Sequence, residues 1–266
     1  MGLITFNADD SAAYEKSMGR WSRRLAVPFI EFASIGGATK VLDVGCGTGS
    51  LAFALAGMIP RAIITGLDCS QAYINHAREQ AADTGLWFEK GDAAALLYKD
   101  GEFDAVLSLL ALNFVPDPER AVGEMKRVTK RGGVVAASVW DYRGGLTFLR
   151  MFADTAAALD PAGEAFRTKL LSTPLTAPGE FVTVWRKIGL RDTVETSLTI
   201  RMEFKSFADY WEPWLGGQGP IGNYVVSLTT EKRTRLEHHL RLAYLSGGED
   251  GPRSFAATAC VVRGTV

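Results

Sequence analysis

The fold of this chain is decided by residues 41–50, which read VLDVGCGTGS. The first four of these residues are mostly apolar, as in a buried β-strand, and helical spacing begins at Ser50. Between them stand three glycines that alternate with other residues, Gly45, Gly47 and Gly49. Glycine has no Cβ, so it lets a backbone turn sharply and approach a ligand closely. We therefore predict a strand, a ligand-binding turn and a helix; the alternative is an ordinary turn whose glycines are incidental.

The glycine spacing and a neighbouring acid indicate which ligand this turn accepts. A dinucleotide site has the spacing G-x-G-x-x-G and directs a helix N-terminus at a pyrophosphate, whereas these glycines alternate. Asp43 precedes Gly45 by two residues, and its carboxylate would repel a pyrophosphate. A cationic, phosphate-free nucleoside such as S-adenosylmethionine, which carries a sulfonium and an ammonium group, suits an acidic turn. We expect Asp43, Gly45 and Gly47 to bind that cofactor.

Around this turn, residues 39–142 alternate short apolar runs with helical stretches, the pattern of βαβ units around a parallel sheet. Ser70 and Asp117 stand where helix N-caps are expected. A turn over residues 130–133 ends the last helix of this part. The predicted strands span residues 40–44, 63–68, 87–90, 105–109 and 134–139, and the predicted helices span 50–58, 70–84 and 118–129.

The rest of the chain completes the same sheet. A helix is expected at 180–188 and strands at 193–201 and 254–262, while 148–171 and 207–245 read as helices inserted near the carboxyl edge of the sheet. The fold class is α/β: a Rossmann-like seven-stranded, mostly parallel sheet with helices on both faces and helical insertions that form a cap. We expect one domain with four parts: an N-terminal helical cover (1–38), a cofactor-binding core (39–142), a cover over the substrate site (143–253) and a final strand (254–266).

A second carboxylate stands at the end of the second predicted strand. Asp68 could accept both ribose hydroxyls of a bound nucleoside, as an acid in this place does in Rossmann folds. A helix-capping or solvated aspartate is the alternative. Because Asp68 follows the glycine loop in strand order, ribose binding is the favoured role.

Residues 40–141 resemble a class I S-adenosylmethionine-dependent methyltransferase of the ubiquinone/menaquinone-biosynthesis-like group (methyltransferase type 11-like). Besides the glycine loop, four motifs occur in family order: GDA at 91–93, FDAV at 103–106, NFVPDP at 113–118 and RVTKRGG at 127–133. The resemblance implies S-adenosylmethionine as cofactor and methyl transfer to a small-molecule substrate. It also implies that Asp92 and Ala93 hold the adenine, and we expect Cys46, Cys69 and Leu109, which adjoin these motifs, to contact the cofactor.

Upstream, residues 14–23 (YEKSMGRWSR) resemble the leader helix of the same group, which folds over the cofactor. The resemblance assigns contacts with the methionine end of the cofactor to Tyr14, Arg20 and Trp21. The alternative is an amphipathic surface helix whose tryptophan belongs to the core. The family often has a histidine near Asn113, and this chain departs from that pattern because it has no histidine there. No catalytic base is therefore assigned.

The composition argues against several classes of partner and cofactor. The 266 residues carry 29 Lys and Arg against 30 Asp and Glu, a net charge of −1, so the chain has no basic field for nucleic acid. Three widely spaced cysteines fit neither a disulfide framework nor a zinc site, and no metal is expected. The first residues do not have the apolar run of a signal peptide, so no export is expected, and no apolar run reaches about twenty residues. We expect a soluble cytoplasmic protein without membrane contact; a homodimer is one alternative for its assembly.

The acceptor is only broadly defined by the sequence. Several aromatic residues lie in or beside the covering segments and suggest a small, partly apolar substrate: Trp140, Tyr142, Trp211, Trp214 and Tyr224. His76 and the neighbouring His238 and His239 are expected to be solvated or capping residues. Two other functions stay open at this point, an NAD-dependent oxidoreductase and a non-catalytic S-adenosylmethionine-binding module.

Overall fold

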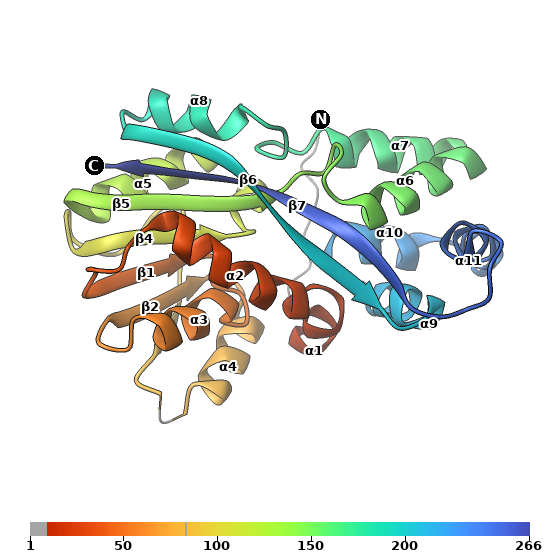
Figure 1. Ribbon diagram of the computed structural model, residues 1–266, viewed down its shortest axis with the longest axis horizontal. Helices are drawn as coiled ribbons and strands as arrows, with labels where there is room; N and C mark the ends of the chain where they lie inside the picture. Colours follow the sequence, from red (N-terminus) through yellow and green to blue (C-terminus); the bar gives the residue numbers. More distant parts are fainter. Residues whose placement is uncertain (1–9, 83) are drawn as a thin grey trace.

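The computed structural model describes residues 10–82 and 84–266. A seven-stranded sheet in the order β3-β2-β1-β4-β5-β7-β6 runs through the molecule (Figure 1). Only β7 runs antiparallel to its neighbours, β5 and β6, so the predicted mostly parallel sheet is confirmed. The strands are β1 (Lys40–Val44), β2 (Ile63–Asp68), β3 (Trp87–Lys90), β4 (Phe103–Leu109), β5 (Thr129–Trp140), β6 (Arg191–Phe204) and β7 (Arg253–Thr265).

Helices cover both faces of this sheet because its central strands are apolar on both sides. In β1, Val41 belongs to one core cluster, with residues of α2 (Arg20–Ala33), α3 (Ser50–Met58) and α4 (Gln71–Gln80). Its neighbour Leu42 belongs to the opposite cluster, with α5 (Pro118–Val128) and α8 (Glu180–Lys187). Successive side chains of a strand point to opposite faces, so β1 is packed between two helical layers.

Helix starts follow the capping residues read from the sequence. The Ser70 Oγ accepts the backbone N–H of Tyr73 at 3.2 Å, and the Asp117 Oδ1 accepts that of Arg120 at 2.9 Å. Each side chain satisfies an N–H that has no partner inside its own helix. The helix expected over 70–84 ends earlier, at Gln80.

The turn predicted over residues 130–133 is wrong, because these residues belong to β5. Phe103 pairs with Thr129 but Ala105 pairs with Val134, so the extra residues form a bulge opposite β4. Gly132, with φ +81°, donates its N–H to the carbonyl of Val266 at 2.8 Å, and Val266 donates back to Gly133 at 3.0 Å. The C-terminal end of the chain holds this stretch as a strand.

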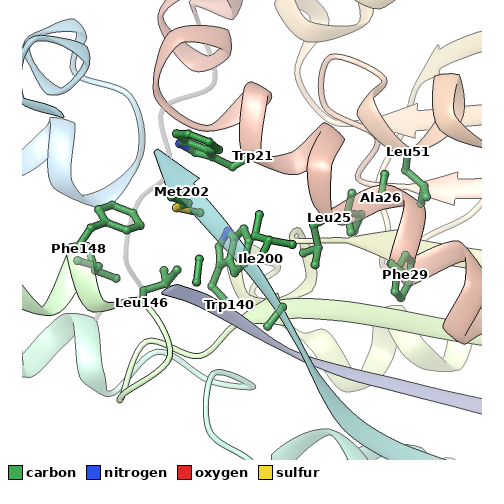
Figure 2. Close-up of a cluster of buried hydrophobic side chains, with 14 of the residues drawn as sticks. Trp21, Leu25, Ala26, Phe29, Leu51, Trp140, Leu146, Phe148, Ile200 and Met202 are labelled. Carbon is green, nitrogen blue, oxygen red and sulfur yellow. The ribbon is translucent and has the colours of Figure 1, made fainter. Parts of the chain in front are cut away.

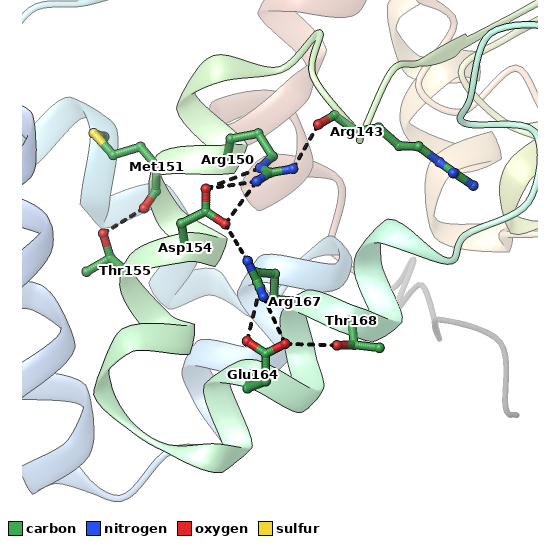
Figure 3. A network of polar contacts seen from close by, with 8 residues as sticks. All are labelled: Arg143, Arg150, Met151, Asp154, Thr155, Glu164, Arg167 and Thr168. Atoms are coloured by element: carbon green, nitrogen blue, oxygen red, sulfur yellow. Dashed lines mark hydrogen bonds and ion pairs between the residues drawn. The ribbon is translucent and has the colours of Figure 1, made fainter.

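The inserted helices stand beyond the carboxyl ends of the parallel strands (Figure 1). The first insertion consists of two helices, α6 (Thr147–Leu159) and α7 (Pro161–Leu171). Asp160 caps the end of α6 and the start of α7, and Pro161 is the first residue of α7. Figure 3 shows Arg167 of α7 between Asp154 of α6 and Glu164, with nitrogen–oxygen distances of 3.4 and 2.9 Å. The second insertion comprises α9 (Phe207–Trp211), η3 (Glu212–Gly216), α10 (Gly219–Ser227) and α11 (Thr230–Leu245).

The N-terminal segment starts at the same end of the sheet, and its last helix runs back along one face (Figure 1). It consists of α1 (Ser11–Tyr14), a π-helical turn η1 (Glu15–Gly19) and α2. A π-helical turn of this kind is rare and is often found at functional sites. Across residues 10–82 and 84–266, none of the helices has the length and apolarity needed to cross a bilayer.

Candidate functional site

A cavity of about 620 Å³ opens at the carboxyl ends of the parallel strands. This is the edge at which open α/β sheets bind their ligands. One half of its wall comes from the ends of β1, β2 and β3 and is rich in glycine and aspartate. The other half comes from the loops after β4 and β5 and from α6, η3 and α10, and is mainly apolar. We call these the cofactor half and the acceptor half.

The glycine loop is shaped by positive φ angles of 73° at Gly45, 55° at Gly47 and 95° at Gly49. A Cβ added to Gly45 would stand 2.3 Å from the Cβ of Ala111, so this glycine is needed for packing within the protein. A Cβ on Gly47 would meet no protein atom within 4 Å. Gly47 lines the cavity, so it leaves room for a ligand at this point.

Asp43 lies beneath the loop and is fully buried. Neither of its carboxylate oxygens has a hydrogen-bond partner among the described residues. Burial, and then the negative charge of Asp68, raise the pKa of Asp43 to about 8; the backbone N–H of Ala52, which does not meet the geometry of a full hydrogen bond to this carboxylate, offsets only part of the rise. A buried acid without partners favours a cation beside it, because a cation would compensate the lost hydration.

Asp68 connects the end of β2 to the glycine loop. Its Oδ2 accepts the N–H of Gly47 at 2.9 Å, and its Oδ1 accepts the N–H of Ser70 at 2.8 Å. Burial raises its pKa, and these hydrogen bonds lower it. Each carboxylate oxygen has a second lone pair, so the carboxylate retains acceptor capacity toward the cavity that it lines.

The other cofactor residues predicted from the sequence surround the same space. Asp92 Oδ1 accepts the N–H of Ala94 at 2.8 Å, which fixes the turn after β3. Ten of the twelve predicted residues line the cavity: Tyr14, Asp43, Gly45, Cys46, Gly47, Asp68, Cys69, Asp92, Ala93 and Leu109.

Arg20 and Trp21 are the two predicted residues that do not line this cavity. The Arg20 Nη1 pairs with Asp209 Oδ1 at 2.9 Å, and its guanidinium stands 4.4 Å from the centre of the Trp21 ring. Trp21 is 4% exposed and packs edge-on against Phe204 at 5.6 Å. Figure 2 shows it within the buried cluster that includes Met202. The structure therefore places these two side chains where they join the N-terminal helix to β6 and α9, and not in the cavity wall where the sequence predicted them.

The N-terminal cover is fastened to the glycine loop by one short contact. Glu15 Oε1 accepts the hydroxyl of Thr48 at 2.5 Å, and Glu15 also pairs with Arg23. Tyr14 hydrogen-bonds Ser22 at 3.2 Å and packs on Tyr73 with 5.1 Å between ring centres. These contacts hold Tyr14 in the wall of the cavity.

Several lining residues had no signal in the sequence. Leu110 has a φ of +61°, a strained conformation for a residue with a side chain, and it follows β4 directly into the cavity. Tyr73 and Gln218 come from α4 and the start of α10, and the Tyr73 hydroxyl donates to Gln218 Oε1 at 3.2 Å. Nothing near them in the chain marks these positions, because the fold alone brings the two segments together.

The aromatic residues of the covering segments divide into two groups. Trp140, Tyr142 and Trp214 line the acceptor half. Trp211 stacks on Phe207 and Tyr224 on Phe166, outside the lining. Burial raises the pKa of Tyr142, although the Asn113 side chain hydrogen-bonds its phenol. Among the described residues, no group of three His, Cys, Asp or Glu side chains could hold a metal ion.

Comparison with known proteins identifies the class to which this fold and site belong. Residues 35–167 match the family model described as a methyltransferase domain. The match spans half of the chain, and the chain belongs to this family. This family agrees with the class I S-adenosylmethionine-dependent methyltransferases that the glycine loop and motif order indicated. The ubiquinone/menaquinone-like subgroup is not distinguished, and neither the oxidoreductase nor the non-catalytic module is favoured.

Two curated relatives share part of the chain. The trans-aconitate 2-methyltransferase of Variovorax paradoxus is 34% identical over 140 residues, covering 52% of this chain and 53% of that protein. The phosphatidylethanolamine N-methyltransferase of Cereibacter sphaeroides is 38% identical over 100 residues, covering 36% and 48%. The chain thus spans about half the length of the curated relatives it matches.

Solved structures share the fold over nearly the whole chain. The YcgJ protein of Bacillus subtilis superposes with a TM-score of 0.59 at 17% identity, covering 92% of this chain and 98% of that one. Phosphoethanolamine N-methyltransferase 2 of Haemonchus contortus has a TM-score of 0.60 at 14% identity, covering 97% and 57%. At these identities the likeness concerns the fold.

Proposed function

We propose that this chain transfers a methyl group from S-adenosylmethionine to a small, partly apolar acceptor. The observation that carries the proposal is Asp43, a fully buried carboxylate without a hydrogen-bond partner in the described chain, at the wall of a glycine-lined cavity. A cationic, phosphate-free nucleoside supplies the positive charge that such an acid favours.

The residues of the cofactor half fit this cofactor. Asp68 would accept the ribose hydroxyls with its remaining lone pairs, and Asp92 and Ala93 would hold the adenine beside the end of β3. Gly47 leaves open space where a side chain would intrude. When bound, the cofactor supplies an electrophilic methyl group and a neutral leaving thioether.

The protein then contributes mainly position, which alone can accelerate a displacement greatly. No lysine, arginine or histidine is among the described residues that line the cavity. The phenols of Tyr14 and Tyr142 stay protonated near neutral pH, because burial raises the pKa of both, that of Tyr14 to about 12. Neither phenol therefore serves as a general base near neutral pH, and the acids of the lining, Asp43, Asp68 and Asp92, stand in the cofactor half. We propose that the acceptor carries an atom that is nucleophilic without a base in the acceptor half.

Other features of the protein are part of the same proposal. We propose that residues 1–266 form one methyltransferase domain, with residues 1–9 outside the described part. Three unpaired thiols, Cys46, Cys69 and Cys260, support a reducing cytoplasmic location. The net charge of −1 supports a small-molecule substrate rather than nucleic acid. The acceptors in the relatives' names differ from one another and do not identify the acceptor of this chain.

Calorimetry with S-adenosylmethionine and S-adenosylhomocysteine tests the proposal. Both ligands should bind, and methyl-labelled cofactor should transfer its label to a small-molecule fraction of cell extract. Absence of heat with either ligand would rule the proposal out. Binding without transfer to any fraction would favour a non-catalytic module instead.

A further inference from the structure

S-adenosylmethionine carries one negative group, its α-carboxylate, and the cavity that would hold it is acidic. The acids of the lining are Asp43, Asp68 and Asp92. Over residues 10–82 and 84–266, the lining contains no lysine, arginine or histidine. Arg20, which the sequence assigned to the methionine end, pairs with Asp209 instead. The carboxylate therefore needs uncharged N–H or O–H donors, because a buried charge without partners is costly.

The glycine loop has few donors left for this carboxylate. Four of its backbone N–H groups already donate to oxygen atoms of the protein, over distances between 2.7 and 3.0 Å; they belong to Gly45, Cys46, Gly47 and Gly49. The hydroxyl of Thr48 in the same loop donates to Glu15 at 2.5 Å. These five groups cannot serve a ligand without losing a partner, so a donor from another part of the wall is needed.

Gln218 offers such a donor. This residue stands between η3 and α10, lines the cavity and is 6% exposed. Its Oε1 accepts the hydroxyl of Tyr73 at 3.2 Å. Its Nε2 has no acceptor among the described residues and is not enclosed by them, whereas the indole nitrogens of Trp140 and Trp214 are enclosed. An oxygen atom of a ligand in the cavity can therefore accept the N–H groups of this carboxamide.

The contact with Tyr73 brings Gln218 to the cofactor half, although the residue belongs to the cap. Tyr73 lies in the first turn of α4, directly after the end of β2, and packs on Tyr14 with 5.1 Å between ring centres. Gly217 and Gly219 flank Gln218 with φ angles of 70° and 66°, a conformation that glycine adopts without strain. The hydroxyl of Tyr73 fixes one end of the carboxamide, so its nitrogen is left for a ligand.

We infer that the side-chain amide of Gln218 donates a hydrogen bond to the α-carboxylate of S-adenosylmethionine, in a cavity wall without a cationic side chain. The inference rests on the proposed function, because it assigns a further residue to the same cofactor. The ribose and the adenine have acids near them, Asp68 and Asp92, whereas the carboxylate has none that it could favour. A neutral N–H donor also binds a charged oxygen more strongly than a neutral one.

Calorimetry with ligands that lack the carboxylate tests the inference. The ligands are S-adenosylhomocysteine, decarboxylated S-adenosylhomocysteine and methylthioadenosine, which lacks the whole amino-acid end. Gln218→Met keeps a side chain of similar length and removes the amide. It should weaken S-adenosylhomocysteine about ten- to 100-fold, the effect of one hydrogen bond to a charged group. The other two ligands should bind within about threefold of their affinity for the native protein.

Two further variants complete the comparison. Gln80→Met is the matched control, because Gln80 is the exposed last residue of α4 and lies outside the cavity lining. It should leave the affinities of all three ligands unchanged. Gln218→Asn stays polar and withdraws the amide by one methylene group, so it should show the same selective loss as Gln218→Met. Its result decides the question if Gln218→Met does not fold.

The possible results separate the two proposals. Failure of S-adenosylhomocysteine to bind the native protein overturns the proposed function. If it binds, the inference alone is overturned by variants of Gln218 that bind it as the native protein does. Equal losses for all three ligands overturn it as well, because they would place Gln218 beside the nucleoside or give it a structural role. A loss confined to the ligand with the carboxylate supports it.

Discussion

The carboxylate of Asp68 accepts the backbone N–H of Gly47 at 2.9 Å, which fixes the end of β2 against the glycine loop that follows β1. The same carboxylate accepts Ser70 N–H at the start of α4. One side chain thus positions the two strand ends between which the nucleoside would lie. We propose that this acid has two functions, one in the architecture of the loop and one toward the ribose.

Asp68→Ala should weaken S-adenosylhomocysteine binding about 100-fold or more, because hydrogen bonds from two hydroxyls to a charged group are lost. Calorimetry gives the dissociation constant. Asp154→Asn is the control, since Asp154 pairs with arginines on α6 and α7 away from the cavity. If Asp68→Ala binds within about threefold of the native protein, Asp68 does not hold the ribose.

Two neighbouring glycines should respond differently to alanine. Gly47→Ala places a side chain at a φ of 55°, which should cost about 1–2 kcal/mol of unfolding free energy. The added methyl group meets no protein atom but points into the space for the ligand. It should also weaken cofactor binding at least about tenfold. Gly45→Ala should cost about 3 kcal/mol or more, because the new methyl group overlaps Ala111.

Urea unfolding and calorimetry distinguish the two effects. Adding Ala111→Gly to Gly45→Ala removes the overlap and should restore part of the stability, whereas it should not restore cofactor binding to Gly47→Ala. The explanation is wrong if Gly47→Ala binds the cofactor normally, or if the second substitution brings no recovery.

How much could be predicted depended on how far apart the interacting residues lie in the chain. The glycine loop and the acids at the ends of β1 and β2 were predictable, because carboxyl ends of neighbouring parallel strands meet at one edge. The placement of Arg20 was not, because its partner Asp209 lies in a distant segment of the chain. Leu110 could not be found either, since nothing in a leucine indicates a φ of +61°. Strand lengths were underestimated where pairing with β7 extends β6, and where the bulge opposite β4 extends β5 back to Thr129.

Arg20 should matter for stability rather than for the cofactor. Arg20→Met removes a partly buried pair with Asp209 and should cost about 1–3 kcal/mol of unfolding free energy. Arg24→Met removes a more exposed pair with Glu203 and should cost less than about 1 kcal/mol. Both variants should bind S-adenosylhomocysteine within about threefold of the native protein. A large loss of affinity in Arg20→Met without loss of stability would show that Arg20 contributes to cofactor binding.

Asp43 should link cofactor binding to proton release. Its folded-state pKa of about 8 lies above its ordinary value, so the acid is largely protonated at pH 7 in the free protein. A bound cation favours the ionised form, and S-adenosylmethionine should therefore release close to one proton at pH 6–7 and fewer above pH 8. Calorimetry in buffers of different ionisation enthalpy measures this number, and Asp43→Asn should reduce it most strongly.

The same shift fixes the sign of a stability change. The folded protein holds this proton between about pH 4 and 8 while the unfolded chain has lost it, so the contribution of Asp43 to the unfolding free energy falls as the pH rises through that range. Above about pH 8 the contribution is constant. Asp43→Asn should be more stable than the native protein at pH 8, and the difference should shrink toward pH 4. A difference that stays constant across this range, together with no proton release on binding, would mean that Asp43 is already ionised in the free protein.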